Sequence, residues 1–134
     1  MARRSRSPRS AFLALGLVLA AALPARADPR LECPDGTQLE LSACLARTEA
    51  AVDRALATAL ESVRQAAAEL DRTTGRPAAA PALDRAQAAW AAYRDAQCAY
   101  VGSSYGGGSG TGQAIRACRI DLGRARTDQL LGPP

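Results

Sequence analysis

The sequence predicts an all-α fold, a small antiparallel three-helix bundle braced by two disulfides. Apolar residues recur at steps of three, four and seven over three long stretches, which Gly- or Pro-rich segments separate. No useful length alternates with the period of two that a strand requires. The chain also has four cysteines, an even number that indicates two disulfides if the protein is exported. Its 134 residues are enough for one domain.

Residues 1–27 are typical of a signal peptide. They hold five arginines and no acidic residue, and residues 11–23 within them form an apolar segment. As a helix this segment would reach about 20 Å, too short for a bilayer core of about 30 Å. Pro24 and the small-x-small pattern of residues 25–27 then indicate cleavage. We therefore expect a domain of residues 28–134 that is periplasmic or secreted, with no membrane contact after cleavage.

The composition excludes most catalytic chemistry. The chain has neither histidine nor lysine, and all 17 basic residues are arginine. This excludes catalytic triads, His-ligated zinc, the P-loop lysine and Schiff-base lysines. Beyond the leader, twelve arginines face thirteen acidic residues, a net charge of −1 that gives no reason to expect nucleic acid as a partner. We expect no enzyme activity, no metal and no cofactor.

The first helix is predicted over residues 38–71. Thr37 and Glu40 have the spacing of a capping box, a hydroxyl residue three positions before a carboxylate. No Gly or Pro interrupts the stretch before Gly75. The expected inner face consists of Leu41, Leu45, Val52, Leu56, Leu60, Val63, Ala67 and Leu70.

Two further helices are predicted on either side of a glycine-rich loop. The second begins around Pro81, a residue tolerated in a first turn, and ends at Gly102. The third covers residues 113–131. The single tryptophan, Trp90, is expected to anchor the core, and Arg94 is expected to pair with an acid such as Asp53. The other expected inward residues are Leu83, Ala86, Tyr93, Gln97 and Val101 on the second helix and Ile115, Cys118, Leu122, Ala125, Gln129 and Leu130 on the third.

The four cysteines allow three pairings. Folding the second helix back on the third brings Cys98 and Cys118 to similar heights. Cys33 lies just before the first helix, and Cys44 lies in its second or third turn. We therefore favour Cys33–Cys44 and Cys98–Cys118, with Cys44–Cys98 and Cys33–Cys118 as the main alternative.

The segment from residue 83 to 98 carries a characteristic set of residues, which are Leu83, Ala86, Gln87, Trp90, Tyr93, Arg94, Asp95 and Cys98. This set resembles the LprI-type lysozyme inhibitors, and the resemblance extends to Cys33, Cys44, Asp53, Leu56, Gly107, Gly108, Ser109, Cys118, Arg126 and Leu130. The chain departs from the pattern at Ala57, Leu60 and Gly123, where the family commonly has Asn, an aromatic residue and Thr. The resemblance implies an exported helical domain that, in some members, binds and inhibits lysozyme.

The glycine-rich loop is the candidate contact element. Six of the eleven residues from 102 to 112 are glycine, and Tyr105 lies near the middle. Loops on a rigid scaffold commonly carry recognition, and tyrosine offers a large contact area with few rotatable bonds. We expect Tyr105, Gly107, Gly108 and Ser109 to contact a protein partner, with lysozyme the suggested target. The residues Gln87, Trp90, Arg94, Asp95 and Arg126 are expected to be structural.

One alternative to the contact role of the loop and two alternatives to lysozyme inhibition remain open at this point. The loop could be only a flexible connection. The protein could be an envelope or stress interaction module with no lysozyme activity. It could also be a small periplasmic carrier that holds a ligand between its helices.

Overall fold

The computed structural model describes residues 28–33 and 36–132, so the leader of residues 1–27 lies outside the described residues. Its elements are a 3₁₀ turn, η1 (Pro29–Glu32), followed by the helices α1 (Gln38–Thr74), α2 (Ala79–Ser103) and α3 (Thr111–Leu131). No strand occurs within these two ranges. The prediction of an all-α, three-helix fold is confirmed.

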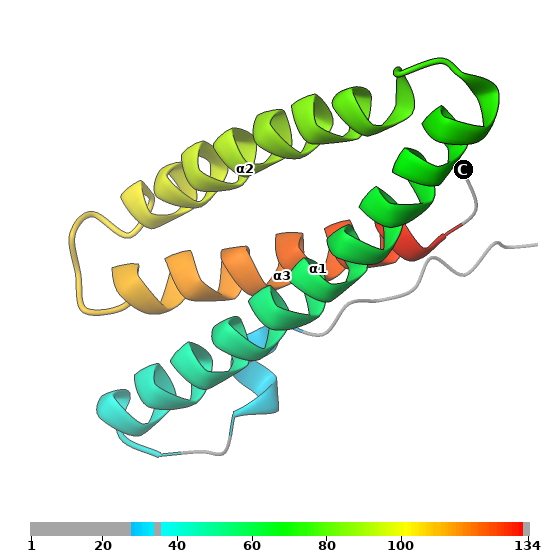
Figure 1. The fold of residues 1–134 in the computed structure, drawn as a ribbon. Helices are drawn as coiled ribbons and strands as arrows, with labels where there is room; N and C mark the ends of the chain where they lie inside the picture. The colour runs from blue at the N-terminus through cyan, green and yellow to red at the C-terminus, as the bar shows by residue number, and fades with distance from the viewer. Residues whose placement is uncertain (1–27, 34–35, 133–134) are drawn as a thin grey trace, which may run out of the picture.

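The helix α3 is the centre of the molecule. It lies antiparallel beside α2, and α1 crosses it obliquely while also meeting the beginning of α2 (Figure 1). The largest interface is between α1 and α3, and η1 packs beside these two helices. Connectivity is therefore antiparallel as predicted, with α1 inclined to the α2–α3 hairpin.

Both ends of α1 follow from local sequence. Thr37 accepts a hydrogen bond from the Glu40 amide, and the Glu40 carboxylate accepts one from the Thr37 amide, which completes the predicted capping box. The helix ends at Gly75, whose φ of 65° lies in the left-handed region that glycine tolerates. It runs three residues beyond the predicted end because nothing before Gly75 stops it.

The helix α2 starts two residues earlier than predicted, and its cap comes from α1. Ala78, at the N-cap position, has no side chain that accepts a hydrogen bond. The Asp71 carboxylate instead accepts hydrogen bonds from the amides of Ala78, Ala79 and Ala80, at 3.0, 2.7 and 3.0 Å. These bonds satisfy amides that a helix start leaves without partners, and they hold the pKa of Asp71 below its ordinary value.

Asp71→Asn is expected to lower the melting temperature at neutral pH by a few degrees, because the neutral amide accepts more weakly from the helix start. A lowered folded-state pKa stabilises the protein above the unfolded value of 3.8, and this contribution disappears as the pH falls through the folded value. The gap between the two proteins in thermal unfolding should therefore close in acid. A gap that persists at low pH would contradict the capping role.

The buried core lies mainly between α1 and α3. It is formed by Leu45, Val52, Leu56 and Ala59 from α1 and by Ala114, Ala117 and Ile120 from α3, whereas α2 contributes Cys98 and Gly102. The predicted inner face of α1 is confirmed at Leu45, Val52 and Leu56, but Leu70 is exposed. Leu70 lies near the end of α1, beyond the buried part of the α1–α3 interface.

Several predictions about the core are wrong. Ala86, Tyr93 and Gln129 are expected to point inward but are exposed. Trp90 is only half-buried, because it lies on α2, which covers one side of α3 and buries few of its own residues. On α3 the expected inward residues, such as Cys118 and Leu122, are half-buried, whereas the unpredicted Ile120 is fully buried. Helix α3 is packed between α1 and α2, so two of its faces are buried. The face that the sequence did not predict is the one that meets α1.

Both favoured disulfides are present. Cys33 and Cys44 have Cα atoms 6.0 Å apart, and those of Cys98 and Cys118 are 5.5 Å apart. The first disulfide fixes η1 to α1, and the second joins the last part of α2 to the first half of α3. Across the described ranges no helix is long and apolar enough to cross a membrane. The same residues contain no group of three side chains able to hold a metal ion.

Candidate functional site

The loop of residues 104–110 connects two helices that are held closely together at this end. Cys98 is fully buried and joined to Cys118. One turn further, the position of a Cβ atom on Gly102 would lie 2.6 Å from the Ile115 side chain, so only glycine allows α2 to approach α3 this closely. The loop therefore has a rigid base.

The loop itself is an exposed series of turns. Gly106 and Gly107 have φ angles of 61° and 81°, which favour glycine. The amides of Gly106 and Gly108 donate to the carbonyls of Ser103 and Tyr105. Within the described ranges the amides of Gly107 and Ser109 donate no hydrogen bond. The exposed tip, residues 106–109, therefore offers uncommitted donors.

Tyr105 does not project from the loop as expected. Its ring folds back over Gly110, where an added Cβ atom would lie 3.3 Å from the ring. Its hydroxyl accepts a hydrogen bond from Arg30 Nη1 at 3.3 Å. The side chain is nevertheless 42% exposed. Tyr105 thus connects the loop to η1, and the glycines and Ser109 form the tip.

The η1 turn that meets Tyr105 is fixed by charge. Asp28 accepts hydrogen bonds from the Arg30 amide at 2.9 Å and from Arg30 Nη2 at 2.6 Å. The side-chain bond from Arg30 lowers the pKa of Asp28, and the same bond raises the pKa of Arg30 further. Glu32, at the end of the turn, pairs with Arg124 of α3, and this bond lowers the pKa of Glu32. The sequence does not predict a role for Arg30, because a contact between residues 75 positions apart leaves no local pattern.

A groove of about 450 Å³ continues from the loop along α2 and α3. Its wall combines aromatic and aliphatic side chains with groups of both charges. The residues that line it are Asp28, Arg30, Tyr93, Gln97, Val101, Tyr105, Ala114, Ala117, Cys118, Asp121 and Leu122. This mixture of an apolar floor and a polar rim is the usual composition of a protein-binding surface.

The signature residues hold α2 against the other helices. Trp90 lies against two guanidinium groups, with Arg94 and Arg126 at 5.6 and 6.0 Å from the ring centroid. Arg126 Nε donates to Gln87 Oε1 at 3.1 Å. Arg94 Nη2 donates to Asp53 at 2.7 Å, which confirms the predicted pairing. These contacts all lie within the fold, as expected of structural residues, although the buried Arg94 Nε has no hydrogen-bond partner within the described ranges.

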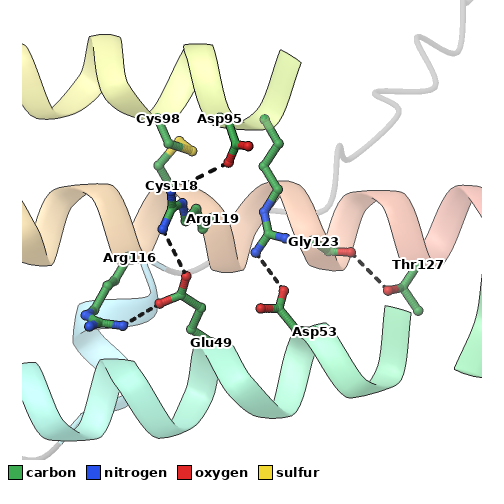
Figure 2. Close-up of polar contacts among 10 residues, drawn as sticks. Glu49, Asp53, Asp95, Cys98, Arg116, Cys118, Arg119, Gly123 and Thr127 are labelled. Carbon is green, nitrogen blue, oxygen red and sulfur yellow. Dashed lines mark hydrogen bonds and ion pairs between the residues drawn. A yellow bond between two sulfur atoms is a disulfide. The ribbon is translucent and has the colours of Figure 1, made fainter. Parts of the chain in front are cut away.

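A second charge network crosses the molecule next to the disulfide. Figure 2 shows the Glu49 carboxylate between Arg116 and Arg119, with Asp95 on the far side of Arg119. Glu49 is buried and accepts from Arg116 Nη1 at 2.6 Å. Asp95 lies 3.5 Å from Arg119, which places this signature residue at the α2–α3 contact. Glu49 and Asp95 thus form, with their arginine partners, an ion-pair network that links the three helices.

The structure explains why this chain has glycine at position 123. A Cβ atom at this position would lie 2.6 Å from Val52 Cγ1, so the glycine lets α1 approach α3 closely. The same position lies 3.9 Å from Arg94 Nη2, near the pairing with Asp53. The departure from the family's usual threonine is therefore part of the α1–α3 packing around Val52.

Comparison with known proteins agrees with this arrangement. The family model described as "Lysozyme inhibitor LprI" matches residues 32–130, which include both disulfides, the signature residues and the loop. The chain belongs to the LprI lysozyme inhibitor family.

A relative of this LprI-family chain has also been found. An uncharacterized protein of Rhizobium meliloti (strain 1021) is 34% identical over 129 residues, which cover 91% of this chain and 93% of that protein. No solved structure matches the chain significantly. Family membership is therefore the finding from which a function is argued.

Proposed function

We propose that this protein is exported, loses residues 1–27, and acts in the periplasm or outside the cell as a lysozyme inhibitor. Family membership is the observation that carries the proposal. Two disulfides support export, because such bonds persist in oxidising compartments. The mature domain of residues 28–134 would act by contact with a protein partner and would catalyse no reaction.

The loop tip is the proposed inhibitory element. Glycosidases of the lysozyme type carry two carboxyl groups on either side of the scissile bond, inside a cleft. Amide donors bind carboxylates strongly, and the tip offers the amides of Gly107 and Ser109 together with the Ser109 hydroxyl. Because glycine has no side chain, the tip is thin enough to enter a cleft. The groove along α2 and α3 would then face the rim of that cleft.

Gly108→Gln is expected to raise the inhibition constant for the sensitive lysozyme at least about tenfold, because the new side chain thickens the tip. Gly108 does not have a positive φ, and a Cβ atom there has only an ordinary 3.4 Å contact with the Tyr105 carbonyl. The substitution should therefore leave the fold unchanged. The measurement is inhibition of a panel of lysozyme types by protein exported with its own leader and purified from the periplasm.

Gly112→Gln is the matched control, because an added Cβ atom at Gly112 meets nothing within 4 Å and the residue lies in the first turn of α3. This variant should inhibit as the unchanged protein does. Equal inhibition by both variants would exclude the tip as the contact. No inhibition and no co-elution with any lysozyme at micromolar protein would overturn the proposed function.

One observation favours a ligand carrier as a second function. A groove of about 520 Å³ lies between the end of α1, the start of α2 and the end of α3. Its wall is mostly apolar and is formed by Val63, Ala66, Ala67, Leu70, Ala79, Leu83, Gln129, Leu130 and Gly132. The lysozyme panel separates the two functions, because a carrier for a small apolar ligand would inhibit no lysozyme.

A further inference from the structure

The first residue of the proposed mature chain is held in a fixed place. The Asp28 carbonyl accepts a hydrogen bond from the Leu31 amide at 2.8 Å. The Asp28 carboxylate accepts hydrogen bonds from the Arg30 amide at 2.9 Å and from Arg30 Nε at 3.0 Å. Pro29, the next residue, is fully buried. Cleavage after residue 27 therefore leaves the new amino terminus on an ordered turn.

This amino terminus lies at the groove beside the loop, because Asp28 lines that groove. η1 packs against α3 and α1 at this place (Figure 1). In the uncleaved chain a peptide bond joins Asp28 to residue 27, so the leader starts from the groove wall. Cleavage exchanges that peptide bond for an ammonium group. The other charged or titratable residues that line the groove are Arg30 of η1, Tyr93 of α2, Tyr105 of the loop and Asp121 of α3.

The charged side chains around Asp28 are one positive charge short of neutrality. Asp28 pairs with Arg30 within η1. Glu32 pairs with Arg124 of α3, and Asp121 lies close enough to Arg124 for their charges to interact. The five side chains are three carboxylates and two guanidinium groups, which leaves one negative charge in excess. An ammonium group on Asp28 supplies the missing charge, and the attraction between opposite charges then stabilises the cluster.

We propose that the α-ammonium group of Asp28, formed by cleavage after residue 27, is part of the contact site and holds η1 in place beside the loop. It adds the positive charge that the cluster needs, next to the Arg30 side chain that donates to Tyr105. The uncleaved chain lacks this charge and carries the leader at the groove. The inference deepens the proposed inhibitory function and rests on the proposed cleavage site.

The composition of the chain makes the charge of this group easy to observe. The chain has no histidine and no lysine, and all four of its cysteines form disulfides. Carboxylic acids titrate below about pH 6, tyrosine and arginine titrate above about pH 9, and an α-amino group titrates at about 7.7–8.0. Between about pH 6.5 and 9 the amino terminus is therefore the one group of the mature chain whose charge is expected to change greatly.

The first test is thermal unfolding, at pH values from about 6.5 to 9, of the protein exported with its own leader and purified from the periplasm. The surrounding carboxylates raise the folded-state pKa of the ammonium group above its unfolded value. Its stabilising effect is then complete below the unfolded value and is lost as the pH rises through the folded value. The melting temperature should fall by a few degrees over this range. Intact mass should show that the chain begins at Asp28.

Insertion of Gly-Ser-Gly between Ala27 and Asp28 moves the ammonium group up to about 10 Å along the chain and changes no side chain of the domain. The melting temperature of this variant should stay nearly constant over the same pH range. The same three residues added after Pro134 are the matched control, which should show the full fall. A fall that the insertion at Asp28 leaves unchanged overturns the proposal, and so does a mature protein whose melting temperature does not fall.

The excess negative charge has its own test. Asp121→Asn removes it and should reduce the fall in melting temperature by about half or more. Asp128→Asn is the matched control, because Asp128 lies about two turns further along α3 and outside the groove, and this variant should keep the full fall. Equal falls for the two variants would contradict the role assigned to the cluster.

The second readout is inhibition of the sensitive lysozyme at pH 7. The Gly-Ser-Gly insertion at Asp28 should raise the inhibition constant at least about fivefold, whereas the addition after Pro134 should leave it unchanged. Equal inhibition by the two proteins overturns the place of the ammonium group in the contact site. The melting temperatures need no lysozyme, so a failure of the proposed inhibitory function leaves the first test intact.

Discussion

Replacing Cys98 and Cys118 together by alanine is expected to lower the free energy of unfolding by about 3 kcal/mol. The disulfide closes a loop of 20 residues, and its loss returns the corresponding entropy to the unfolded chain. Such a loss is a large part of the roughly 5–15 kcal/mol of total stability that small domains have. The measurement is urea denaturation followed by far-UV circular dichroism.

The same double variant should also inhibit lysozyme more weakly than its stability alone would explain. The disulfide lies at the base of the 104–110 loop, so its removal frees the tip before the fold is lost. The matched control is the double replacement of Cys33 and Cys44, whose shorter loop predicts a similar loss of stability. If both double variants lose stability and inhibition equally, the Cys98–Cys118 disulfide has no special role at the tip.

Leu45→Ala is expected to lower the free energy of unfolding by about 2–5 kcal/mol. Leu45 is fully buried in the cluster with Cys33, Val52 and Ile120, so the shorter side chain leaves a cavity. The cost combines the lost burial of apolar surface with the incomplete collapse of that cavity. Denaturant titration measures this change directly.

Leu39→Ala is the matched control for this change. Leu39 lies less than two turns before Leu45 in α1, but its side chain is 79% exposed. The substitution should alter stability by no more than about 0.5 kcal/mol, as is usual for surface positions. Comparable losses for the two leucines would mean that the core is not where the structure places it.

The sequence predicted features whose causes are local. The capping box at Thr37, the three helices and the neighbouring disulfides all follow from spacing along the chain. The pairing of Arg94 with Asp53 was predicted because one arginine followed Trp90 by one turn and an acid was available on another helix. These features need only helix geometry and a simple antiparallel order.

Features that depend on how helices cross were missed. Ile120 was not predicted to be buried, because α3 has two buried faces and a single amphipathic stripe describes only one. Trp90 was expected to anchor the core by its size, yet two arginines cover it on a helix that is mostly exposed. The Asp71 cap of α2 depends on the turn at Gly75, which no short motif encodes.

The exposed loop was predicted from the sequence, but its contacts with the rest of the fold were not. The glycine-rich segment does form an exposed loop on a braced base. The hydrogen bond of the Tyr105 hydroxyl with Arg30, near the other end of the chain, was not predicted. Arg30 and Tyr105 are far apart in the sequence and both line the groove beside the loop, so the groove was not predicted either.

The order of the disulfides has a consequence for how the chain matures. Each disulfide joins two cysteines that are consecutive in the sequence, Cys33 to Cys44 and Cys98 to Cys118. An oxidising enzyme that joins thiols as they emerge, amino terminus first, therefore makes the native bonds without later rearrangement. Oxidative maturation of this protein should require an electron acceptor but no isomerase.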